Sequence, residues 1–366
     1  MKPKICIVGA TGELGKKLLN YCYKNNIDIS CITFFNNKKK ALKIKEKFDI
    51  KNYFSLKDNH QKNLFIKYLC TNYIDIIYFL DCGSYSLKYV DLYLNKNSRS
   101  YIAIANKELI VSGGSLLINK IKKSKNIFIP LDSEHFSLFE KLTQKYLFDD
   151  IKKIYITASG GPFYFKKNID LNSVSLKDVL NHPKWKMGVN NTIDSSNFVN
   201  KLLEIFELSI IFKIDIGKIS FVLSHNAFIH SIVEKNDGTI SFNCFNNDMM
   251  ITLLKPISYF YKLNYNFNYS KIFNIENFQI EKFNDKRFYL LNNLNKFKKM
   301  KHSEIIRFMI LNNRAHTKYL NGQINYNYIV PFINNHLIID KEKKYFKSFD
   351  DILEFIEYEK NIIKSL

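Results

Sequence analysis

The chain has 366 residues, of which 46% are hydrophobic, and this length predicts roughly two or three domains with buried cores. Lysine and arginine number 55 against 34 acidic residues, which gives a formal net charge of +21 at pH 7. No apolar run reaches the length of a membrane-spanning helix, and no basic and apolar leader precedes the first predicted strand. We therefore expect a cytoplasmic protein with no membrane partner.

The positive charge is compatible with nucleic-acid binding, but its distribution argues against that function. The lysines are scattered among asparagines along the whole chain, whose richness in Lys, Asn, Ile, Tyr and Phe is typical of an AT-rich genome. We predict no nucleic-acid partner and expect the positive field to attract an anionic substrate and cofactor. The six cysteines form no C-x-x-C pair, which favours reduced thiols.

Residues 1–150 alternate between strand and helix patterns. The apolar segments KICIVGA, DISCITFF, DIIYFLD, YIAIAN and NIFIPLD are typical of buried strands, and helical segments separate them. This alternation predicts an α/β domain with a doubly wound parallel sheet.

Three glycines lie where the first predicted strand meets the first predicted helix. In the segment VGATGELG they are Gly9, Gly12 and Gly15. Glycines permit a tight turn and the close approach of a ligand, and a helix N-terminus favours a phosphate. The spacing is G-x-x-G-x-x-G rather than G-x-G-x-x-G, and a simple strand–helix turn is the alternative. The position at the first βα junction favours nucleotide binding.

The end of the second predicted strand bears on the choice between NAD and NADP. An acid that binds the ribose belongs at this end, but the segment CITFF is followed by Asn36, Asn37 and lysines at 38–40. Amide and ammonium groups suit a 2′-phosphate, so we favour NADP. A solvated lysine run is the alternative.

Asn106, Lys107 and Glu108 follow a later strand of the same predicted sheet. Ligands bind at this carboxyl edge in doubly wound sheets, where a lysine can hold a phosphate or polarise a carbonyl. The start of a capped helix explains the three residues about as well.

Asp132, Ser133, Glu134 and His135 follow the last predicted strand of this half. The two acids would repel each other unless a cation or a proton lay between them. Their hard oxygen ligands suit Mg²⁺ or Mn²⁺. A helix cap with first-turn acids that the helix dipole favours is the alternative.

The pattern changes after residue 150. IKKIYITASGGPF predicts a strand that runs into a Gly-Gly-Pro turn, residues 164–192 have the composition of a long loop, and SSNFVNKLLEIFELSIIF predicts a helix. KISFVLS and AFIHSIVEKNDGTISFNCF predict strands, with Asp237-Gly238 as a hairpin turn. A polar, asparagine-rich connection follows, and the C-terminal segment is helical.

Asn200, Lys201 and Glu204 fall close together on the predicted helix, since positions 200 and 204 are four residues apart. The amide and the ammonium group can bind a phosphate, and Glu204 can supply a third metal oxygen. Ser195 precedes this group, and Ser159 lies before the Gly-Gly-Pro turn.

The segment HPKWKMG holds His182 and Trp185, the only tryptophan of the chain. An apolar lid with one tryptophan can cover a nicotinamide and exclude water. A core anchor is the alternative for Trp185, although its loop setting argues against it.

In this order, the motifs resemble those of the 1-deoxy-D-xylulose 5-phosphate reductoisomerase family. The chain has GATGELG, ANKE, DSEH, SGGPF, HPKWKMG and DSSNFVNKLLE where the family has GxTGxxG, ANKE, DSEH, SGGPF, HPxWxMG and DSxxxxNKxxE. The resemblance spans roughly residues 5–260, and the combination of DSEH with HPxWxMG and NKxxE is highly specific.

The resemblance implies NADPH-dependent rearrangement and reduction of 1-deoxy-D-xylulose 5-phosphate to 2-C-methyl-D-erythritol 4-phosphate, in isoprenoid precursor synthesis, with Mg²⁺, Mn²⁺ or Co²⁺. It implies a homodimer and an α/β fold: a Rossmann-like NADPH-binding domain at 1–150 and an α+β catalytic and dimerisation domain at 151–265. An active-site lid at about 160–192, a connection at 266–290 and a C-terminal helical domain at 291–366 complete the implied organisation.

The resemblance also implies roles for individual residues. The implied metal ligands are Asp132, Glu134 and Glu204. The implied substrate contacts are Lys107, Ser133, Glu134, Ser159, His182, Trp185, Ser195, Asn200, Lys201 and Glu204, with Lys107, Glu134 and His182 in catalytic roles. The implied cofactor contacts are Gly9, Thr11, Gly12, Glu13, Leu14, Asn36, Asn37, Asn106, Glu108 and Gly188.

Several segments depart from the family pattern. Phe35 and Asn36 stand where the family has a glycine and a basic residue, which weakens the preference for NADPH unless Lys38 compensates. DCGSYSLKYV replaces a glycine-rich stretch before ANKE, and HNAF replaces a His-Pro-Gln-Ser start. Two other hypotheses are another NADP-dependent oxidoreductase on sugars or semialdehydes, and a decayed scaffold or basic binding protein that keeps the fold.

Overall fold

The computed structural model describes residues 2–96, 99–142, 150–181, 188–224, 227–263, 265, 280–283, 285–341 and 344–366. The chain divides into two compact units. The first comprises Met1–Phe139 and Asn246–Ile272, and the second comprises Glu140–Phe245 and Phe273–Leu366.

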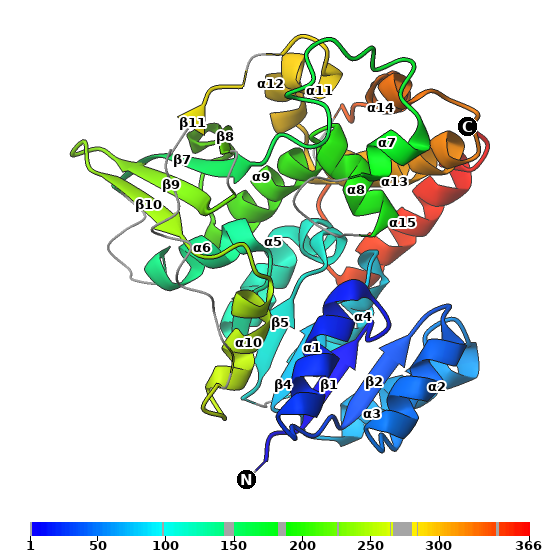
Figure 1. The fold of residues 1–366 in the computed structure, drawn as a ribbon. Coiled ribbons are helices and arrows are strands. Elements are labelled where there is room, and N and C mark those ends of the chain that lie inside the picture. The colour runs from blue at the N-terminus through cyan, green and yellow to red at the C-terminus, as the bar shows by residue number, and fades with distance from the viewer. Residues whose placement is uncertain are drawn as a thin grey trace. The chain divides into compact units, whose positions relative to one another are not determined.

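The first unit is built on a six-stranded parallel sheet in the order β3-β2-β1-β4-β5-β6 (Figure 1). Its strands are β1 (Ile5–Val8), β2 (Cys31–Phe34), β3 (Asn52–Ser55), β4 (Ile76–Phe79), β5 (Tyr101–Ile104) and β6 (Ile127–Pro130). All residues of β1, β2 and β4 are buried, as expected for the middle of a parallel sheet. The predicted doubly wound sheet is therefore confirmed, and its strand order is that of dinucleotide-binding domains.

Helices connect the strands of this sheet. They are α1 (Glu13–Lys24), α2 (Lys38–Lys47), α3 (Asn59–Thr71), η1 (Ser84–Ser86), α4 (Leu87–Leu94), α5 (Lys107–Lys123) and α6 (Ser133–Leu142). Each strand therefore ends at a turn into a helix, which gathers the loops after β1, β2, β4, β5 and β6 at one edge of the sheet.

A helix from much later in the chain completes the core of the first unit. This helix, α10 (Met250–Ser258), buries Met250, Leu253 and Leu254 in the same cluster as residues of β1, α1 and β4. The hydroxyl of Tyr78 on β4 donates a hydrogen bond to the carbonyl oxygen of Leu253 at 2.8 Å. The core of this unit therefore depends on segments that lie 175 positions apart in the sequence.

The second unit contains a mixed sheet in the order β10-β9-β7-β8-β11. Its strands are β7 (Ile151–Ala158), β8 (Ile219–Ser224), β9 (Ile229–Lys235), β10 (Ile240–Cys244) and β11 (Ile280–Glu281). Strands β7 and β8 are parallel, and the other pairs are antiparallel. Gly238, with φ +85°, lies in the predicted turn between β9 and β10.

The helices of the second unit include one break that the sequence did not predict. They are α7 (Leu176–Leu180), α8 (Val189–Ser196), α9 (Val199–Phe212), η2 (Ile216–Lys218), α11 (Tyr289–Asn292), α12 (Leu294–Lys298), α13 (His302–Leu320), η4 (Tyr326–Tyr328), α14 (Ile329–His336) and α15 (Phe349–Ile363). The single helix predicted from Ser195 onward is wrong, because the chain turns between α8 and α9 at Phe198, whose φ is +68°.

Phe198 is held in this left-handed conformation by aromatic packing. Its ring lies 4.8 Å from that of Phe283, 5.0 Å from that of Phe288 and 6.1 Å from that of Phe221, measured between ring centroids. A bulky residue at positive φ is strained and persists where its surroundings fix it. The packed ring therefore sets the angle between α8 and α9, which carry several candidate site residues.

The C-terminal helices are joined by a buried ion-pair network. The Arg307 guanidinium on α13 donates to both carboxylate oxygens of Glu359 on α15, at 2.9 and 2.7 Å. The predicted helical character of the C-terminal segment is confirmed.

Among the described residues, no helix combines the length and the apolarity that crossing a membrane requires.

Candidate active site

The glycine loop between β1 and α1 is shaped by backbone crowding. Gly9 has φ +85°, and a Cβ atom there would lie 2.6 Å from the backbone nitrogen of Asp81. A Cβ atom on Gly15 would lie 2.5 Å from the carbonyl oxygen of Ala10. Gly12 is exposed, and its nearest described contact would be 3.4 Å away, so crowding does not explain this glycine. A phosphate that approaches the N-terminus of α1 fits the Gly12 position.

The other predicted cofactor residues of this loop take part in local contacts. The carbonyl oxygen of Thr11 accepts a hydrogen bond from the ammonium group of Lys40. The carboxylate of Glu13 pairs with Lys16 at 2.6 Å. Leu14 is partly buried against the core of the first unit. These contacts fix the loop at the carboxyl edge of the sheet.

The end of β2 contains no acid and places its lysines in different surroundings. Asn37 caps α2, because its side-chain oxygen accepts a hydrogen bond from the backbone N–H of Lys40 at 3.1 Å. Asn36 and Lys38 are exposed. The lysine that contacts the glycine loop is therefore Lys40, whereas the sequence analysis named Lys38 as the compensating residue.

The side chain of Asn106, which follows β5, both caps a helix and contacts the residues after β4. Its side-chain oxygen caps α5 by accepting from the N–H of Leu109 at 3.0 Å. Its amide nitrogen donates to the carbonyl of Gly83 at 2.9 Å and to the Asp81 carboxylate at 3.3 Å. Asn106 is therefore a helix cap, as one interpretation of the sequence predicts, and it also lies at the carboxyl edge of the sheet, as the other predicts. Glu108 occupies the first turn of α5.

Asp81 joins this region as a carboxylate that the sequence analysis did not select. It follows β4 and accepts a hydrogen bond from the hydroxyl of Ser86 at 2.5 Å. Burial raises the pKa of Asp81 to about 6, although Ser86 and Asn106 oppose the change. An acid after β4 was visible in the segment FLDCG, but nothing in the sequence indicated that it would be half-buried with a raised pKa.

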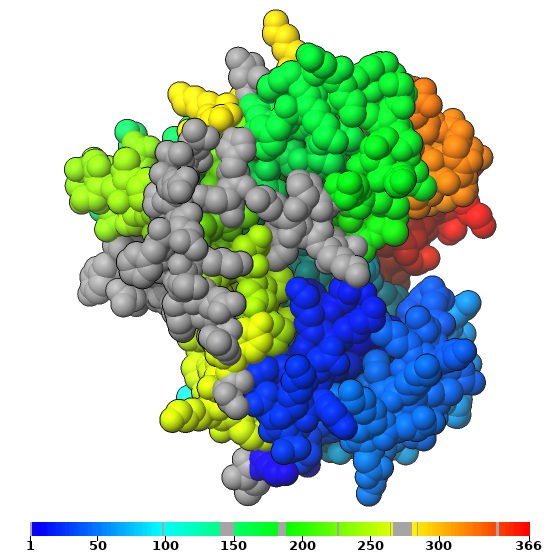
Figure 2. Space-filling model, in the orientation of Figure 1, coloured from blue at the N-terminus to red at the C-terminus, as the bar shows by residue number. Residues whose placement is uncertain are grey.

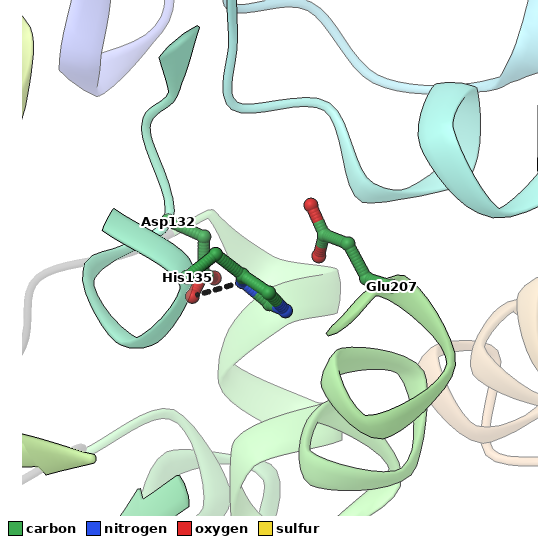
Figure 3. Close-up of side chains that lie close together, drawn as sticks. All are labelled: Asp132, His135 and Glu207. Atoms are coloured by element: carbon green, nitrogen blue, oxygen red, sulfur yellow. Dashed lines mark hydrogen bonds and ion pairs between the residues drawn. The ribbon is translucent and has the colours of Figure 1, made fainter. Parts of the chain in front are cut away.

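Asp132, between β6 and α6, lies in a compact polar cluster of the first unit. It forms an ion pair with the ammonium group of Lys107. Its other oxygen lies 2.8 Å from Nδ1 of His135 and accepts from the backbone N–H of Glu134 at 3.2 Å. Figure 3 shows the hydrogen bond between Asp132 and His135.

The charges around Asp132 keep its carboxylate ionised. Burial acts to raise the pKa of Asp132, but Lys107 and then His135 outweigh it and hold the pKa well below the usual range. Glu134 accepts a hydrogen bond from the hydroxyl of Ser133, and one of its carboxylate oxygens lies within 4.8 Å of one of Asp132. This pair of oxygens is a fitting donor set for a hard divalent cation.

In the second unit, the Gly-Gly-Pro turn after β7 packs closely on α8. A Cβ atom on Gly161 would lie 3.0 Å from the carbonyl oxygen of Ser195, and Gly161 has φ +61°. Ser159 precedes the turn, and Ser195 lies near the end of α8; both are half-buried. The structure thus brings the SGGPF and DSS segments together, although they are about 35 positions apart in the sequence.

The first turns of α9 carry the predicted Asn-Lys-Glu group. The Asn200 amide donates to one carboxylate oxygen of Glu204, and the Lys201 ammonium donates to the other at 2.7 Å. Glu204 is only 1% exposed, so its charge depends on these partners. The predicted common face of positions 200, 201 and 204 is therefore confirmed.

Two further polar residues deserve a place among the candidates. Glu207 follows Glu204 by three positions on α9 and is fully buried, as is His135 on α6. An acid inside the apolar run LLEIFELSIIF was a usable signal for Glu207. His135 stood in the DSEH segment but was not assigned a role.

The predicted lid lies only partly within the described structure. His182 and Trp185 fall outside the described residues. Gly188 is exposed and is the N-cap residue of α8. The segment before it holds a short helix, α7, which begins with a capping box formed by Ser175 and Asp178. The composition of residues 164–192 predicted a loop without this helix, which is wrong at α7.

The strand order, the glycine loop and the polar residues at the carboxyl edge place the first unit among dinucleotide-binding α/β domains. The family model described as the 1-deoxy-D-xylulose 5-phosphate reductoisomerase C-terminal domain matches residues 128–212. A 1-deoxy-D-xylulose 5-phosphate reductoisomerase of Clostridium novyi is 31% identical, with 99% of this chain and 98% of the relative covered. The enzyme of that name from Pelagibacter ubique is 32% identical, with 91% and 87% covered. The chain belongs to the 1-deoxy-D-xylulose 5-phosphate reductoisomerase family.

Solved structures with this fold cover nearly all of both chains. A DOX-P reductoisomerase in complex with NADPH, fosmidomycin and magnesium has a TM-score of 0.86 and 23% identity, with 99% of this chain and 98% of that chain covered. The reductoisomerase of Zymomonas mobilis in complex with NADPH has a TM-score of 0.83 and 21% identity, with 100% of both chains covered. These two comparisons establish the fold.

Proposed function

We propose that this chain catalyses the NADPH-dependent rearrangement and reduction of 1-deoxy-D-xylulose 5-phosphate to 2-C-methyl-D-erythritol 4-phosphate, assisted by a divalent metal ion. Membership of the family is the observation that carries this function. The glycine loop suits NADPH, and the oxygens of Asp132 and Glu134 suit the metal.

The first unit would bind the cofactor through its glycine loop and the ends of β2 and β5. The proposed contacts are Gly9, Thr11, Gly12, Glu13, Leu14, Asn36, Asn37, Asn106 and Glu108, with Gly188 from the second unit. The open side of Gly12 and the α1 N-terminus would face the phosphates. Bound NADPH supplies the hydride; the protein supplies its position.

Asp132, Glu134 and Glu204 are the proposed metal ligands. A bound divalent ion supplies Lewis-acid polarisation of the substrate oxygens. Asp132 remains ionised beside Lys107, and Glu204 is held by Asn200 and Lys201. Each proposed ligand is thus a carboxylate whose orientation is fixed by a neighbouring donor, as effective metal sites require.

Ser159, Ser195, Asn200 and Lys201 are the proposed phosphate contacts of the substrate. All four lie in the second unit, and the Gly161–Ser195 contact keeps the first two segments together. Hydroxyl, amide and ammonium donors are the groups that bind a phosphate monoester. Ser133, His182 and Trp185 complete the proposed substrate contacts, with Lys107, Glu134 and His182 in the proton-transfer steps.

The function is tested by NADPH oxidation with 1-deoxy-D-xylulose 5-phosphate and Mg²⁺ or Mn²⁺, against NADH and a chelator. Glu204→Gln should lower kcat/KM by at least about 100-fold, because a charged ligand is lost. Glu234→Gln is the matched control, since Glu234 pairs with Lys152 on the surface of the second sheet and should leave kcat/KM unchanged. Metal-independent turnover, or reduction of sugars other than this substrate, would contradict the proposal.

We also propose that the protein is a cytoplasmic homodimer. Strand β10 lies at one end of the second sheet and exposes Ile240 and Phe242, at 57% and 50%. Figure 2 shows the β9–β10 hairpin (yellow-green) at the molecular surface. Exposed apolar edge strands favour pairing with a second copy.

Phe242→Lys should shift the mass measured by light scattering from that of a dimer to that of a monomer. Lys235→Ala is the control and should leave the mass unchanged. A monomeric wild-type protein would contradict the proposed dimer. Cell fractionation tests the location.

A further inference from the structure

We propose that the ammonium group of Lys40 selects NADPH over NADH by binding the 2′-phosphate of the adenosine ribose. The inference deepens the proposed function and rests on it. In this role, Lys40 replaces the basic residue that the family pattern places before the asparagine, where this chain has Asn36.

The position of Lys40 is the first support for this role. Lys38, Lys39 and Lys40 form the first turn of α2, but only Lys40 is half-buried; the other two are exposed. Its ammonium group reaches the glycine loop and donates to the carbonyl oxygen of Thr11. Its backbone N–H is fixed by the Asn37 cap. Lys40 therefore joins the end of β2 to the phosphate-binding loop.

This place is where dinucleotide-binding domains distinguish the two cofactors. An acid near the end of β2 binds the ribose 2′-hydroxyl in NAD-dependent domains, and a cation accommodates the 2′-phosphate in NADP-dependent ones. Residues 31–45 contain no acid. Asn37 uses its side-chain oxygen for the cap, and Asn36 is uncharged. The charge that a 2′-phosphate requires must come from a lysine, and Lys40 is the lysine that faces the loop.

The electrostatic surroundings of Lys40 also suit an anion. Burial, and then the nearby Lys16 ammonium, lower the pKa of Lys40 to about 8, while Glu13 opposes them. The Glu13 carboxylate pairs with the Lys16 ammonium group at 2.6 Å. This single carboxylate offsets only one of the two positive charges of Lys16 and Lys40. Two neighbouring ammonium groups repel each other less when a phosphate, with a charge of about −1.5 to −2, binds beside them. Figure 2 shows α1 and α2, which carry these residues, at the surface of the first unit.

The test is a fluorescence titration of the substrate-free protein with NADPH and with NADH. Lys40→Met keeps the aliphatic stem and removes the charge, so NADPH affinity should fall about 10- to 100-fold, as for one lost charge-assisted hydrogen bond. NADH affinity should change less than about 2-fold, because NADH lacks the 2′-phosphate. Lys39→Met is the matched control from the same turn and should leave both affinities unchanged.

Two further variants distinguish recognition from loop structure. Lys40→Arg should retain most of the NADPH preference, and Glu13→Gln should strengthen NADPH binding more than NADH binding. Equal losses for NADPH and NADH in Lys40→Met would assign Lys40 to loop structure and overturn the inference, as would unchanged NADPH affinity. If the wild-type protein oxidises NADPH with the substrate and Lys40→Met binds NADPH as tightly as the wild type does, only this inference is refuted. A wild type that binds neither cofactor refutes the proposed function as well.

Discussion

Nδ1 of His135 lies 2.8 Å from a carboxylate oxygen of Asp132, and both groups are held at the start of α6. The ring is fully buried, whereas Lys107 pairs with the other oxygen of the same carboxylate. Asp132 is therefore oriented from two sides. We therefore expect His135 to act as a positioning residue for a proposed metal ligand.

His135→Gln should weaken Mn²⁺ binding by about 10- to 100-fold, because partners that orient a metal ligand typically contribute that much. NADPH binding should be unchanged, since the glycine loop does not depend on this ring. Titration calorimetry of Mn²⁺ and NADPH measures both. His60→Gln, on the exposed face of α3, is the control. Unaltered Mn²⁺ affinity in His135→Gln would mean that Lys107 and the backbone N–H of Glu134 orient Asp132 without the ring.

Two glycine substitutions in one loop should separate stability from cofactor binding. Gly15→Ala places a Cβ atom 2.5 Å from the Ala10 carbonyl oxygen and should lower the free energy of unfolding by about 1–3 kcal/mol. Gly12→Ala meets only ordinary contacts, so the stability should hold while NADPH affinity falls. Urea unfolding and NADPH titration test the pair. Equal behaviour of the two variants would contradict this assignment.

Asp81→Asn should stabilise the protein in a pH-dependent way. The folded-state pKa of Asp81, about 6, lies above its usual value, so ionisation opposes folding and stability falls as pH rises from about 4 to 6. The substitution should add about 1–2 kcal/mol to the free energy of unfolding at pH 8 and little at pH 4. Thermal unfolding of both proteins at the two pH values gives the difference. A gain that is equal at both would point to packing rather than charge.

The Asp194 carboxylate beside Ser195 is held by the C-terminal helix α13. Asn312 donates to it at 2.8 Å, and Nε2 of His316 lies 2.9 Å from the same oxygen. Asn312→Ala should lower the free energy of unfolding by about 1–3 kcal/mol, because the partners are buried.

The same substitution should raise KM for the phosphorylated substrate more than it lowers kcat, since Ser195 is a proposed phosphate contact. Asn313→Ala, one position further and exposed, is the control for both readouts. A fall in kcat at constant KM would remove Asn312 from the phosphate site.

Much of the first sheet could be predicted from local pattern. Short runs of β-branched residues, each followed by a helical segment, correspond to β1, β2, β4, β5 and β6. The edge strand β3 was not among the segments named, because Asn52 and Ser55 interrupt its apolar character and its residues are only half-buried. Edge strands carry a weaker pattern than central ones.

Side-chain direction limited the prediction of the site. The sequence placed Asn200, Lys201 and Glu204 on one face because helical spacing decides that face. It could not show that Lys40 rather than Lys38 turns toward the glycine loop, since both follow the same cap. Nor could it show the turn at Phe198, because the aromatic rings that hold its left-handed backbone come from distant segments.

The return of α10 to the first unit has a consequence for synthesis of the chain. Ribosomes release the sheet-forming segments of this unit first, but Met250, Leu253, Leu254 and Ile257 of its core emerge only after the strands β7 to β10. Until then the groove that α10 will fill on β4 and α1 exposes apolar side chains to water. The first unit of the nascent chain therefore lacks part of its core from the end of β6 at Pro130 until α10 is complete at Ser258. Its vulnerability to aggregation should end when residue 258 clears the exit tunnel.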